Sequence, residues 1–267
     1  MKILIPLLVA LFLLPARAAL AAPDFAAALA GEHRSEENRA RDDWRHPAET
    51  LAFFGLEPGM TVVELSPGGG WYTEVLAPLL KGEGKLYAAH FDVNSGAYAR
   101  RSLGGFLRKL GADNEMYGGV VVSTLAPPAT IDIAPAGSAD LVLAFRNVHS
   151  WLRGGTLDPV FAAVFEALKP GGVFGVVQHR APEGRSIEDM KNTGYVTEAH
   201  VIAAAEAAGF ELADSAEINA NPKDTADHPE GVWTLPPTFA LGDKDRDRYL
   251  AIGESDRMTL KFVKPAS

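Results

Sequence analysis

Short apolar segments rich in β-branched residues alternate along this chain with longer segments of helical spacing. The apolar segments lie at residues 60–65, 84–92, 118–125, 139–145, 173–178, 210–218 and 258–265. Strands that alternate with helices of about 10 to 15 residues are typical of a parallel sheet covered by helices on both faces. The sequence therefore predicts an α/β fold with a doubly wound, mostly parallel sheet of seven strands.

Two segments fall outside this alternation. Residues 24–57 have helical spacing and precede the first strand, so we expect cap helices there. Their charged residues Arg41 and Arg45 could close a pocket or lie on a solvated face. Residues 219–255, between the last two strands, are rich in Pro and Asp and too long for an ordinary connection. We expect this insertion to be a lid, with Trp233 among the apolar side chains that cover a pocket.

The start of the chain has the pattern of a cleaved export signal. Lys2 precedes an apolar stretch at residues 3–14, and small residues follow at the spacing that signal peptidases recognise. A membrane-spanning helix needs about 20 apolar residues, and Pro15 and Arg17 interrupt this stretch. We therefore expect a signal peptide at residues 1–22, no stable membrane anchor, and a periplasmic protein.

Composition limits the partners of the chain. It carries 25 basic and 34 acidic residues, a net charge of −9, and no cysteine, which excludes disulfides and thiolate chemistry. An acidic chain without a basic block is a poor candidate for binding nucleic acid, because phosphates demand cationic side chains. We expect a small-molecule partner and a single domain at residues 23–267, and the sequence leaves the oligomeric state open.

A glycine turn joins the first predicted strand to a helix. Gly68 and Gly70 let the backbone approach a ligand closely, and the helix that follows directs its N–H groups toward an anion. The third glycine of the dinucleotide-binding motif is missing, because Trp71, Tyr72 and Thr73 follow Gly70. A turn whose glycines serve packing alone is the alternative.

The spacing Glu64-x-Ser66-x-Gly68-x-Gly70 resembles the first motif of the class I S-adenosylmethionine-dependent methyltransferases, which is an acid followed by three alternating glycines. Segments at residues 138–151, 167–177 and 195–212 resemble later parts of the same superfamily, so that the resemblance covers residues 45–265. Residues 39–78 and 218–238 are similar, more narrowly, to a family of exported bacterial methyltransferase-like proteins without an assigned activity.

The resemblance implies a class I methyltransferase fold, which is Rossmann-like, with S-adenosylmethionine as the cofactor. The residues that it assigns to cofactor binding are Glu64, Ser66, Gly68, Gly70 and Asn147. At the end of the second strand, where the superfamily has an acid for the ribose hydroxyls, stand His90 and, two residues on, Asp92. We include both as cofactor contacts, and the third strand has no acid for the adenine amine.

Reactive side chains follow the fourth and fifth strands. His149 and His179 would lie about one strand spacing of 4.8 Å apart, because these strands are neighbours in the superfamily. Histidine suits general acid–base work near neutral pH, whereas two histidines without a carboxylate make a weak metal site. We predict His149, His179, Arg146 and Tyr195 as catalytic residues, and no metal. Each residue also has a structural alternative. The histidines could simply form hydrogen bonds at the strand ends, Arg146 could form an ion pair with a nearby acid, and Tyr195 could be packed in the interior.

Three functions are compatible with these features. The leading hypothesis is a methyltransferase-like enzyme that acts on a small molecule and binds S-adenosylmethionine at the glycine turn. The second is a lyase or isomerase that has kept the scaffold without the cofactor and uses His149 and His179 for proton transfer on a small molecule such as an aromatic one. The third is a periplasmic binding protein without catalytic activity.

Overall fold

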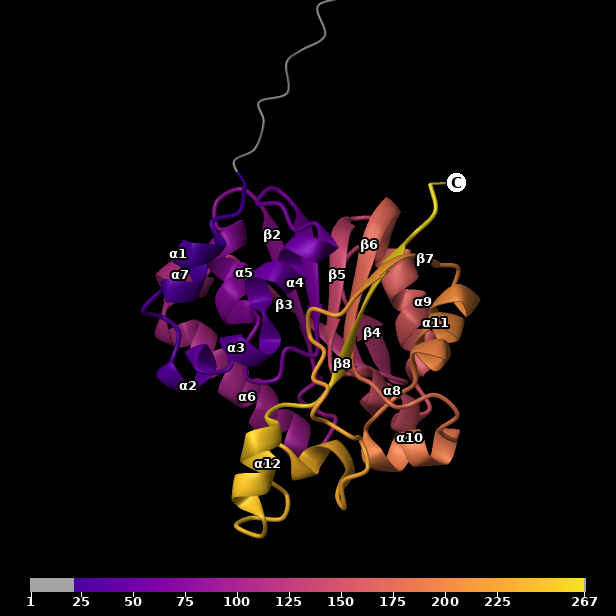
Figure 1. Ribbon diagram of the computed structural model, residues 1–267. Helices are drawn as coiled ribbons and strands as arrows, with labels where there is room; N and C mark the ends of the chain where they lie inside the picture. Colours follow the sequence, from indigo (N-terminus) through magenta and orange to yellow (C-terminus); the bar gives the residue numbers. More distant parts are fainter. Residues whose placement is uncertain (1–21, 267) are drawn as a thin grey trace, which may run out of the picture.

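An eight-stranded sheet runs through the computed structural model, which describes residues 22–266 (Figure 1). The strands are β1 (Thr61–Leu65), β2 (Lys85–His90), β3 (Val120–Ala126), β4 (Thr130–Asp132), β5 (Ala139–Phe145), β6 (Leu168–His179), β7 (Glu211–Ala216) and β8 (Arg257–Val263). Their order in the sheet is β4-β3-β2-β1-β5-β6-β8-β7. Strands β3, β2, β1, β5 and β6 are parallel, and the other three pair antiparallel. The predicted doubly wound, mostly parallel sheet is confirmed.

The sheet has one strand more than the sequence predicted. Strand β4 is only three residues long and pairs antiparallel with the last residues of β3. Its pattern, TID after two prolines, is too short to carry a strand periodicity. The addition lies at the edge of the sheet and leaves the order of the seven predicted strands unchanged.

Helices precede, cover and follow the sheet. The four helices in the expected cap segment are α1 (Phe25–Ala30), α2 (Glu36–Arg39), α3 (Asp42–Arg45) and α4 (Pro47–Phe54). Those between the strands are α5 (Thr73–Leu80), α6 (Ala97–Ala112), α7 (Asn114–Tyr117), α8 (Val148–Gly154), α9 (Leu157–Ala167), α10 (Ile187–Thr193) and α11 (Glu198–Ala207). The insertion contains a short 3-10 helix, η1 (Gly231–Thr234), and α12 (Arg246–Ile252). Within residues 22–266, no helix is both long enough and apolar enough to cross a membrane.

Alternating residues of the central strands build two separate apolar cores. Val63 and Val142 face one core, which contains side chains of α8, α9 and α11. Val62 and Leu141 face the other, which contains side chains of α1, α4, α5 and α7. This period of two, with both faces buried, explains why the strands read as continuous apolar runs in the sequence.

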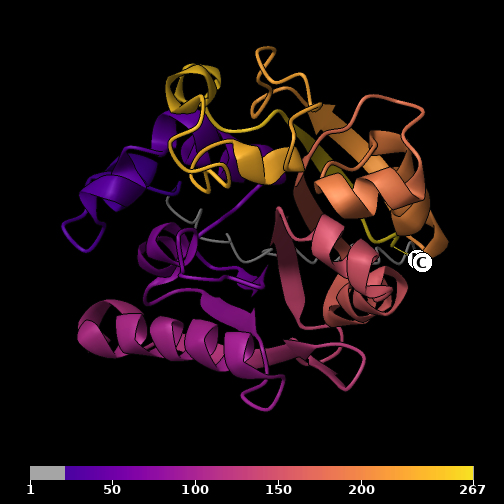
Figure 2. The ribbon, with the colours of Figure 1, turned by 90° about the horizontal axis from the view of Figure 1, so that it is seen from below.

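A buried carboxylate in the insertion, Asp224, is one of the groups that attach it to the rest of the fold. Asp224 accepts hydrogen bonds from the Tyr195 hydroxyl (3.0 Å), His228 Nε2 (2.8 Å) and the backbone N–H of Asp256 (2.8 Å). Figure 2 looks onto the carboxyl ends of the parallel strands and shows the insertion beside the cap helices at this edge. Residues 1–21 of the expected export signal lie outside the described residues.

The packing of α4 against the sheet leads to a first prediction. A Cβ added to Gly175 of β6 would lie 2.8 Å from ring atoms of Phe54. We expect Gly175→Ala to lower the free energy of unfolding by about 2 kcal/mol, because the ring has no room to move in a packed core. Urea unfolding would measure this. Gly119→Ala, whose Cβ would meet nothing within 4 Å, is the control, and equal stability of both variants would contradict the prediction.

Candidate active site

Two adjoining cavities lie at the carboxyl ends of the strands, where the strand order reverses between β1 and β5. The first, of about 360 Å³, we call the arginine cavity; its polar lining includes Asn38, Arg41, Arg45, Glu64, Arg146 and His179. The second, of about 680 Å³, we call the β3 cavity; its lining includes Phe91, Leu125, Ala126, His149, Arg153 and Trp233. Ser66, Gly68 and Asn147 line both cavities, so the two form one trough across the sheet edge.

The residues directly after β1 and β5 have left-handed backbone conformations. Ser66 has φ 47° and Arg146 has φ 63°, a strain that non-glycine residues keep only where neighbours hold them. The N–H of Ser66 donates to Ala89 O (2.8 Å) and that of Arg146 to Val177 O (2.7 Å). The adjacent strands therefore fix both residues as they turn into the trough.

The glycines of the turn have two different roles, one in leaving space for a ligand and one in packing. A Cβ added to Gly68 or Gly69 would meet nothing within 4 Å, and both residues line the arginine cavity. A Cβ on Gly70 would instead lie 3.1 Å from Phe106 and 3.2 Å from Lys109 of α6. The first two glycines thus keep space open for a ligand, whereas Gly70 lets α6 pack against the turn.

Glu64, at the end of β1, is a buried carboxyl group in the arginine cavity. Its Oε2 accepts a hydrogen bond from Thr73 Oγ1 at 2.6 Å. Burial raises the pKa of Glu64 from its usual value to about 7, although the Thr73 hydroxyl and the charges of Lys109 and Arg146 act in the opposite direction. The carboxyl group therefore changes its charge near neutral pH.

The two expected ribose contacts do not reach the cavity walls. His90 is fully buried beneath the glycine turn, where its Nδ1 accepts the N–H of Phe91 (2.8 Å) and its Nε2–H therefore donates to Gly68 O (3.1 Å). The side chain of Asp92 accepts the N–H of Asn94 (2.6 Å) in a turn. Neither residue lines either cavity. His90 holds the glycine turn against β2, a positioning role that the sequence did not suggest.

The two predicted histidines meet, but burial keeps them neutral. The ring centroids of His149 and His179 lie 5.4 Å apart, with His149 in the β3 cavity and His179 in the arginine cavity. Burial lowers the pKa of His149 to about 4, and burial together with the neighbouring His149 holds the pKa of His179 well below its usual value. Both imidazoles are therefore weak proton acceptors at pH 7 and suit hydrogen bonding better than base catalysis.

Tyr195 lies outside both cavities. Its side chain is fully buried and donates its hydroxyl hydrogen to Asp224, at 3.0 Å from Oδ2. The expectation of a catalytic tyrosine is corrected to a structural one, since this hydroxyl anchors the insertion. Trp233 is the residue of the insertion that reaches the trough, where its ring lies 5.8 Å from that of His149.

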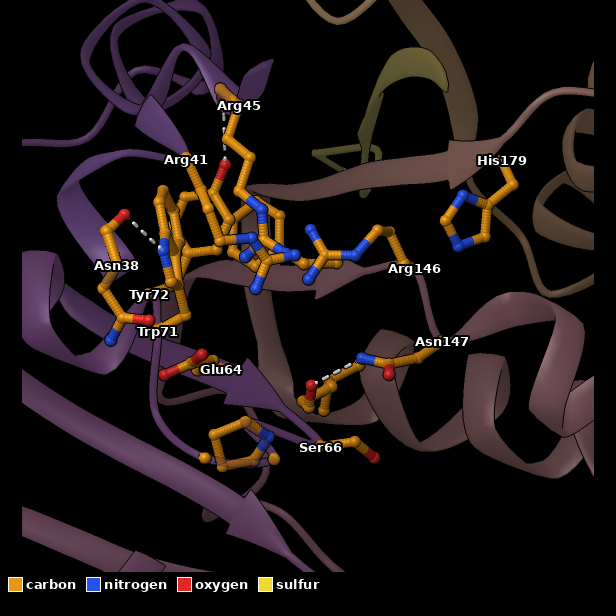
Figure 3. A pocket seen from close by; sticks show the side chains of 15 residues that line it. Asn38, Arg41, Arg45, Glu64, Ser66, Trp71, Tyr72, Arg146, Asn147 and His179 are labelled. Carbon is orange, nitrogen blue, oxygen red and sulfur yellow. Dashed lines mark hydrogen bonds between the residues drawn. The ribbon is translucent and has the colours of Figure 1, made fainter. Parts of the chain in front are cut away.

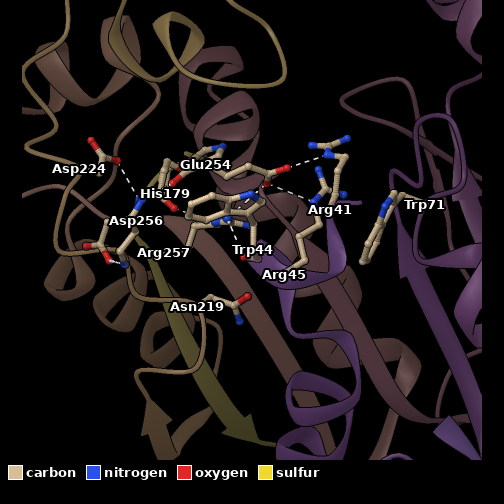
Figure 4. A network of polar contacts seen from close by, with 12 residues as sticks. Arg41, Trp44, Arg45, Trp71, His179, Asn219, Asp224, Glu254, Asp256 and Arg257 are labelled. Atoms are coloured by element: carbon tan, nitrogen blue, oxygen red, sulfur yellow. Dashed lines mark hydrogen bonds and ion pairs between the residues drawn. The ribbon is translucent and has the colours of Figure 1, made fainter. Parts of the chain in front are cut away.

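A cluster of arginines surrounds one carboxylate beside the arginine cavity (Figure 4). Glu254 lies 2.6 Å from Arg41 Nε, 3.2 Å from Arg45 Nε and 3.3 Å from Arg257 Nη2. Arg146 joins them, and Figure 3 shows its guanidinium group beside those of Arg41 and Arg45 on one side of the cavity. The sequence analysis missed Glu254 and Arg257, because more than 200 residues separate them from Arg41 and Arg45.

Asn147 links the two central strands at the centre of the trough. Its Nδ2 donates to Leu65 O at 2.8 Å, across the gap between the ends of β1 and β5. Of the residues in the described range, no three His, Cys, Asp or Glu side chains gather closely enough to hold a metal ion. The trough therefore offers glycine backbone, one titrating carboxyl group, arginines and an apolar wall.

No family model and no curated protein matches the chain. Solved structures do match. A methyltransferase from Aquifex aeolicus superposes with a TM-score of 0.54 at 17% identity, over 84% of this chain and 93% of that one. The chain has the fold of the class I S-adenosylmethionine-dependent methyltransferases. The cyclase SpnF has the same fold, with a TM-score of 0.59 at 16% identity over 89% of this chain and 86% of its own.

A geranyl diphosphate methyltransferase in complex with S-adenosylmethionine also superposes on this chain, with a TM-score of 0.56 at 13% identity. The match covers 92% of this chain and 96% of that one. Identities this low establish the common fold alone.

The pKa of Glu64 predicts a specific pH dependence of stability. Between pH 4.5 and about 7 the folded protein keeps a proton that the unfolded chain has released, so stability falls as the pH rises through this window. The variant Glu64→Gln has no carboxyl group to ionise and so avoids this loss. We expect the difference in free energy of unfolding, variant minus wild type, to be about 3 kcal/mol larger at pH 8 than at pH 4. Urea unfolding at both pH values measures it.

The control for this experiment is Glu83→Gln, which removes an exposed carboxylate. It should follow the wild-type pH profile. Parallel profiles for Glu64→Gln and wild type would show that Glu64 titrates normally in the folded protein.

Proposed function

We propose that the protein is a methyltransferase-type enzyme that binds S-adenosylmethionine at the glycine turn and acts on a small molecule. The observation that carries the proposal is the continuous trough over residues 66–69, in which Gly68 and Gly69 leave open space at the reversal point of the sheet. Doubly wound sheets bind their ligands at this point.

The side chains of the trough fit most of this cofactor. Glu64 provides a carboxylate for an ammonium group, and the β3 cavity provides Phe91, Leu125 and Ala126 as an apolar wall for a nucleoside. These walls offer no carboxylate for the ribose hydroxyls. The position that would supply it is occupied by His90, which hydrogen-bonds to Gly68 O in the glycine turn. We therefore expect S-adenosylmethionine to bind with micromolar affinity through the turn and the apolar wall.

The cofactor, when bound, supplies an electrophilic methyl group for an in-line displacement. The protein's part in such a reaction is mainly positioning. Arg146 and Asn147, fixed at the end of β5, would orient the reacting molecule, and Trp233 would exclude water from the β3 cavity. Glu64, occupied by the ammonium group, would not serve as the base for the acceptor, and the low pKa values of His149 and His179 make them weak proton acceptors, so positioning carries the reaction.

One second function is favoured by a specific observation. The replacement of the ribose acid by a buried histidine, together with a carboxyl group of pKa about 7, also suits a proton-transfer enzyme that needs no cofactor. The cyclase SpnF is a protein of this fold whose reaction is named as a cyclisation. Such an enzyme would use Glu64 with His149 and His179 on a small molecule, as a lyase or isomerase.

Titration with the cofactor decides between the two. We expect S-adenosylmethionine and S-adenosylhomocysteine to bind the purified protein with micromolar dissociation constants by calorimetry. Gly69→Val should weaken both at least tenfold, because its side chain would enter the open space above the turn. Gly119→Val, also in open space but away from the trough, is the matched control. No heat with either ligand, from folded protein at millimolar concentration, would leave the proton-transfer enzyme as the better hypothesis.

We also propose that the enzyme is exported and works in the periplasm, on the strength of the Lys2, apolar and small-residue pattern at residues 1–22. The mature protein should begin near Ala22 or Pro23. Expression of the full chain in a bacterium, followed by cell fractionation and N-terminal sequencing, measures this. An intact Met1 in the cytoplasmic fraction would refute export.

A further inference from the structure

The arginine cavity holds more positive than negative charge. Four guanidinium groups, those of Arg41, Arg45, Arg146 and Arg257, gather around the single carboxylate of Glu254. Burial alone would raise the pKa of Glu254, but the charges of Arg45 and Arg257 outweigh it and hold this pKa at about 2. Glu254 is therefore ionised at neutral pH, and even together with an ionised Glu64 it leaves the four cations in excess.

Two of these arginines lack partners for their hydrogen-bond donors. Arg45 is 2% exposed, and its buried Nη1 has no hydrogen-bond partner among the described residues. Arg146 is half-buried and lines the cavity, and its guanidinium group forms no hydrogen bond or ion pair within residues 22–266. A buried donor without a partner is unfavourable, so an anion that accepts from Arg45 Nη1 and also reaches Arg146 would stabilise this arrangement.

The pKa values of the two arginines reflect the same imbalance. Burial is the largest cause that lowers the pKa of Arg146, to about 10, and the charge of Arg257 lowers it further. Burial and the charge of Arg146 lower the pKa of Arg45. An anion between these groups would relieve both effects, since an opposite charge at close range favours the ionised form.

An aromatic ring packs against one guanidinium group of the cluster, and two further rings stack in the cavity wall. The Arg45 guanidinium carbon lies 4.5 Å from the ring centroid of Trp71, whose indole N–H donates to Asn38 O at 3.0 Å. Tyr72 stacks on Phe145 with ring centroids 3.4 Å apart, and both line the cavity. Arg45 is thus positioned by Trp71 and Glu254, and Arg41 by Glu254, before any ligand arrives, which lowers the entropy lost on binding.

The arginines lie at the opposite end of the trough from the apolar wall of the β3 cavity, where we expect the nucleoside. The β3 cavity reaches from the glycine turn toward the ends of β2 and β3, through Phe91 and Leu125. The arginine cavity reaches the other way, through Arg146 after β5 and His179 at the end of β6. A cofactor with its nucleoside in the β3 cavity and its ammonium group at Glu64 leaves the part of the arginine cavity around Arg41, Arg45 and Arg146 for the second reactant.

We propose that Arg41, Arg45 and Arg146 bind the oxyanion of the acceptor, so that the substrate class is small molecules that carry a carboxylate or a phosphate group. The proposal rests on the proposed function, which assigns the glycine turn to the cofactor. Guanidinium groups pair with both oxyanions through two parallel hydrogen bonds; within the described residues Arg45 Nη1 has no partner, and the guanidinium group of Arg146 lines the cavity unpaired.

The test compares three ring compounds that differ in their polar group: benzoate, phenyl phosphate and benzyl alcohol. Each is titrated calorimetrically into the full chain at constant ionic strength, alone and with saturating S-adenosylhomocysteine. We expect at least one of the two anions to bind, with or without S-adenosylhomocysteine, and the alcohol to bind at least tenfold more weakly. The anion that binds more tightly identifies the acceptor group as carboxylate or phosphate.

Variants connect this binding to the arginines. Arg146→Gln should weaken binding of the anion at least tenfold. Arg41→Gln, at a partly exposed position that carries little risk to folding, should weaken it in the same direction. Arg101→Gln removes the same charge from an exposed position of α6 and should leave the affinity unchanged.

Several outcomes would overturn the proposal. Equal binding of the three compounds, no binding of either anion, or unchanged affinity in both Arg146→Gln and Arg41→Gln would each refute it. Loss of anion binding in the presence of S-adenosylhomocysteine would show that the arginines hold the carboxylate of the cofactor instead. Failure of the proposed function looks different: S-adenosylhomocysteine would not bind, while anion binding would still depend on Arg146.

Discussion

The carboxylate of Glu254 is the contact on which the site depends, because it joins the cap segment to the end of the insertion and the start of β8, more than 200 residues further along the chain. It pairs with Arg41 and Arg45 from the cap segment and with Arg257 from the start of β8. Removal of this one carboxylate would leave several buried guanidinium groups facing one another without compensation. The same pairing brings cap helices and insertion to one end of the sheet, where they wall the trough (Figure 4).

The glycine turn and the arginine cluster show two ways of building a binding site. At the turn the backbone itself makes the surface, since Gly68 and Gly69 have no side chains to fill the space and His90 supports them from below. At the cluster, charged side chains are held by rings and by Glu254. Backbone suits a ligand of fixed shape, and guanidinium groups suit an anionic one.

The fold was accessible from the sequence because its signals are local. Val62, Val63 and their counterparts in the other strands form apolar runs that need only neighbouring residues to be recognised. Strand β4 was not predicted, because three residues are too few to show the alternation of apolar and polar side chains that indicates a strand. The positions of Gly68, Arg146, Asn147, His149 and His179 at the carboxyl edge followed from the same local reading.

The charge and the orientation of the site residues could not be predicted from the sequence, because they depend on contacts with residues that are distant along the chain. Whether His149 is charged is decided by burial, and whether Tyr195 faces a ligand is decided by Asp224, which lies 29 residues away. The strand-end position of His90 was predicted, but its turn beneath Gly68 depends on side-chain packing. Glu254 could be linked to Arg41 only by a folded chain.

The attachment of the insertion through Asp224 bears on which ligands the trough could admit. A flap that opens and closes can adapt to ligands of several sizes and then exclude solvent. Here Tyr195, His228 and the backbone of Asp256 fix the base of the insertion from three directions, and Trp233 is carried on that base. With its base held in this way, the insertion would keep Trp233 at one place in the trough, and the width left beside that ring would limit the size of a bound molecule.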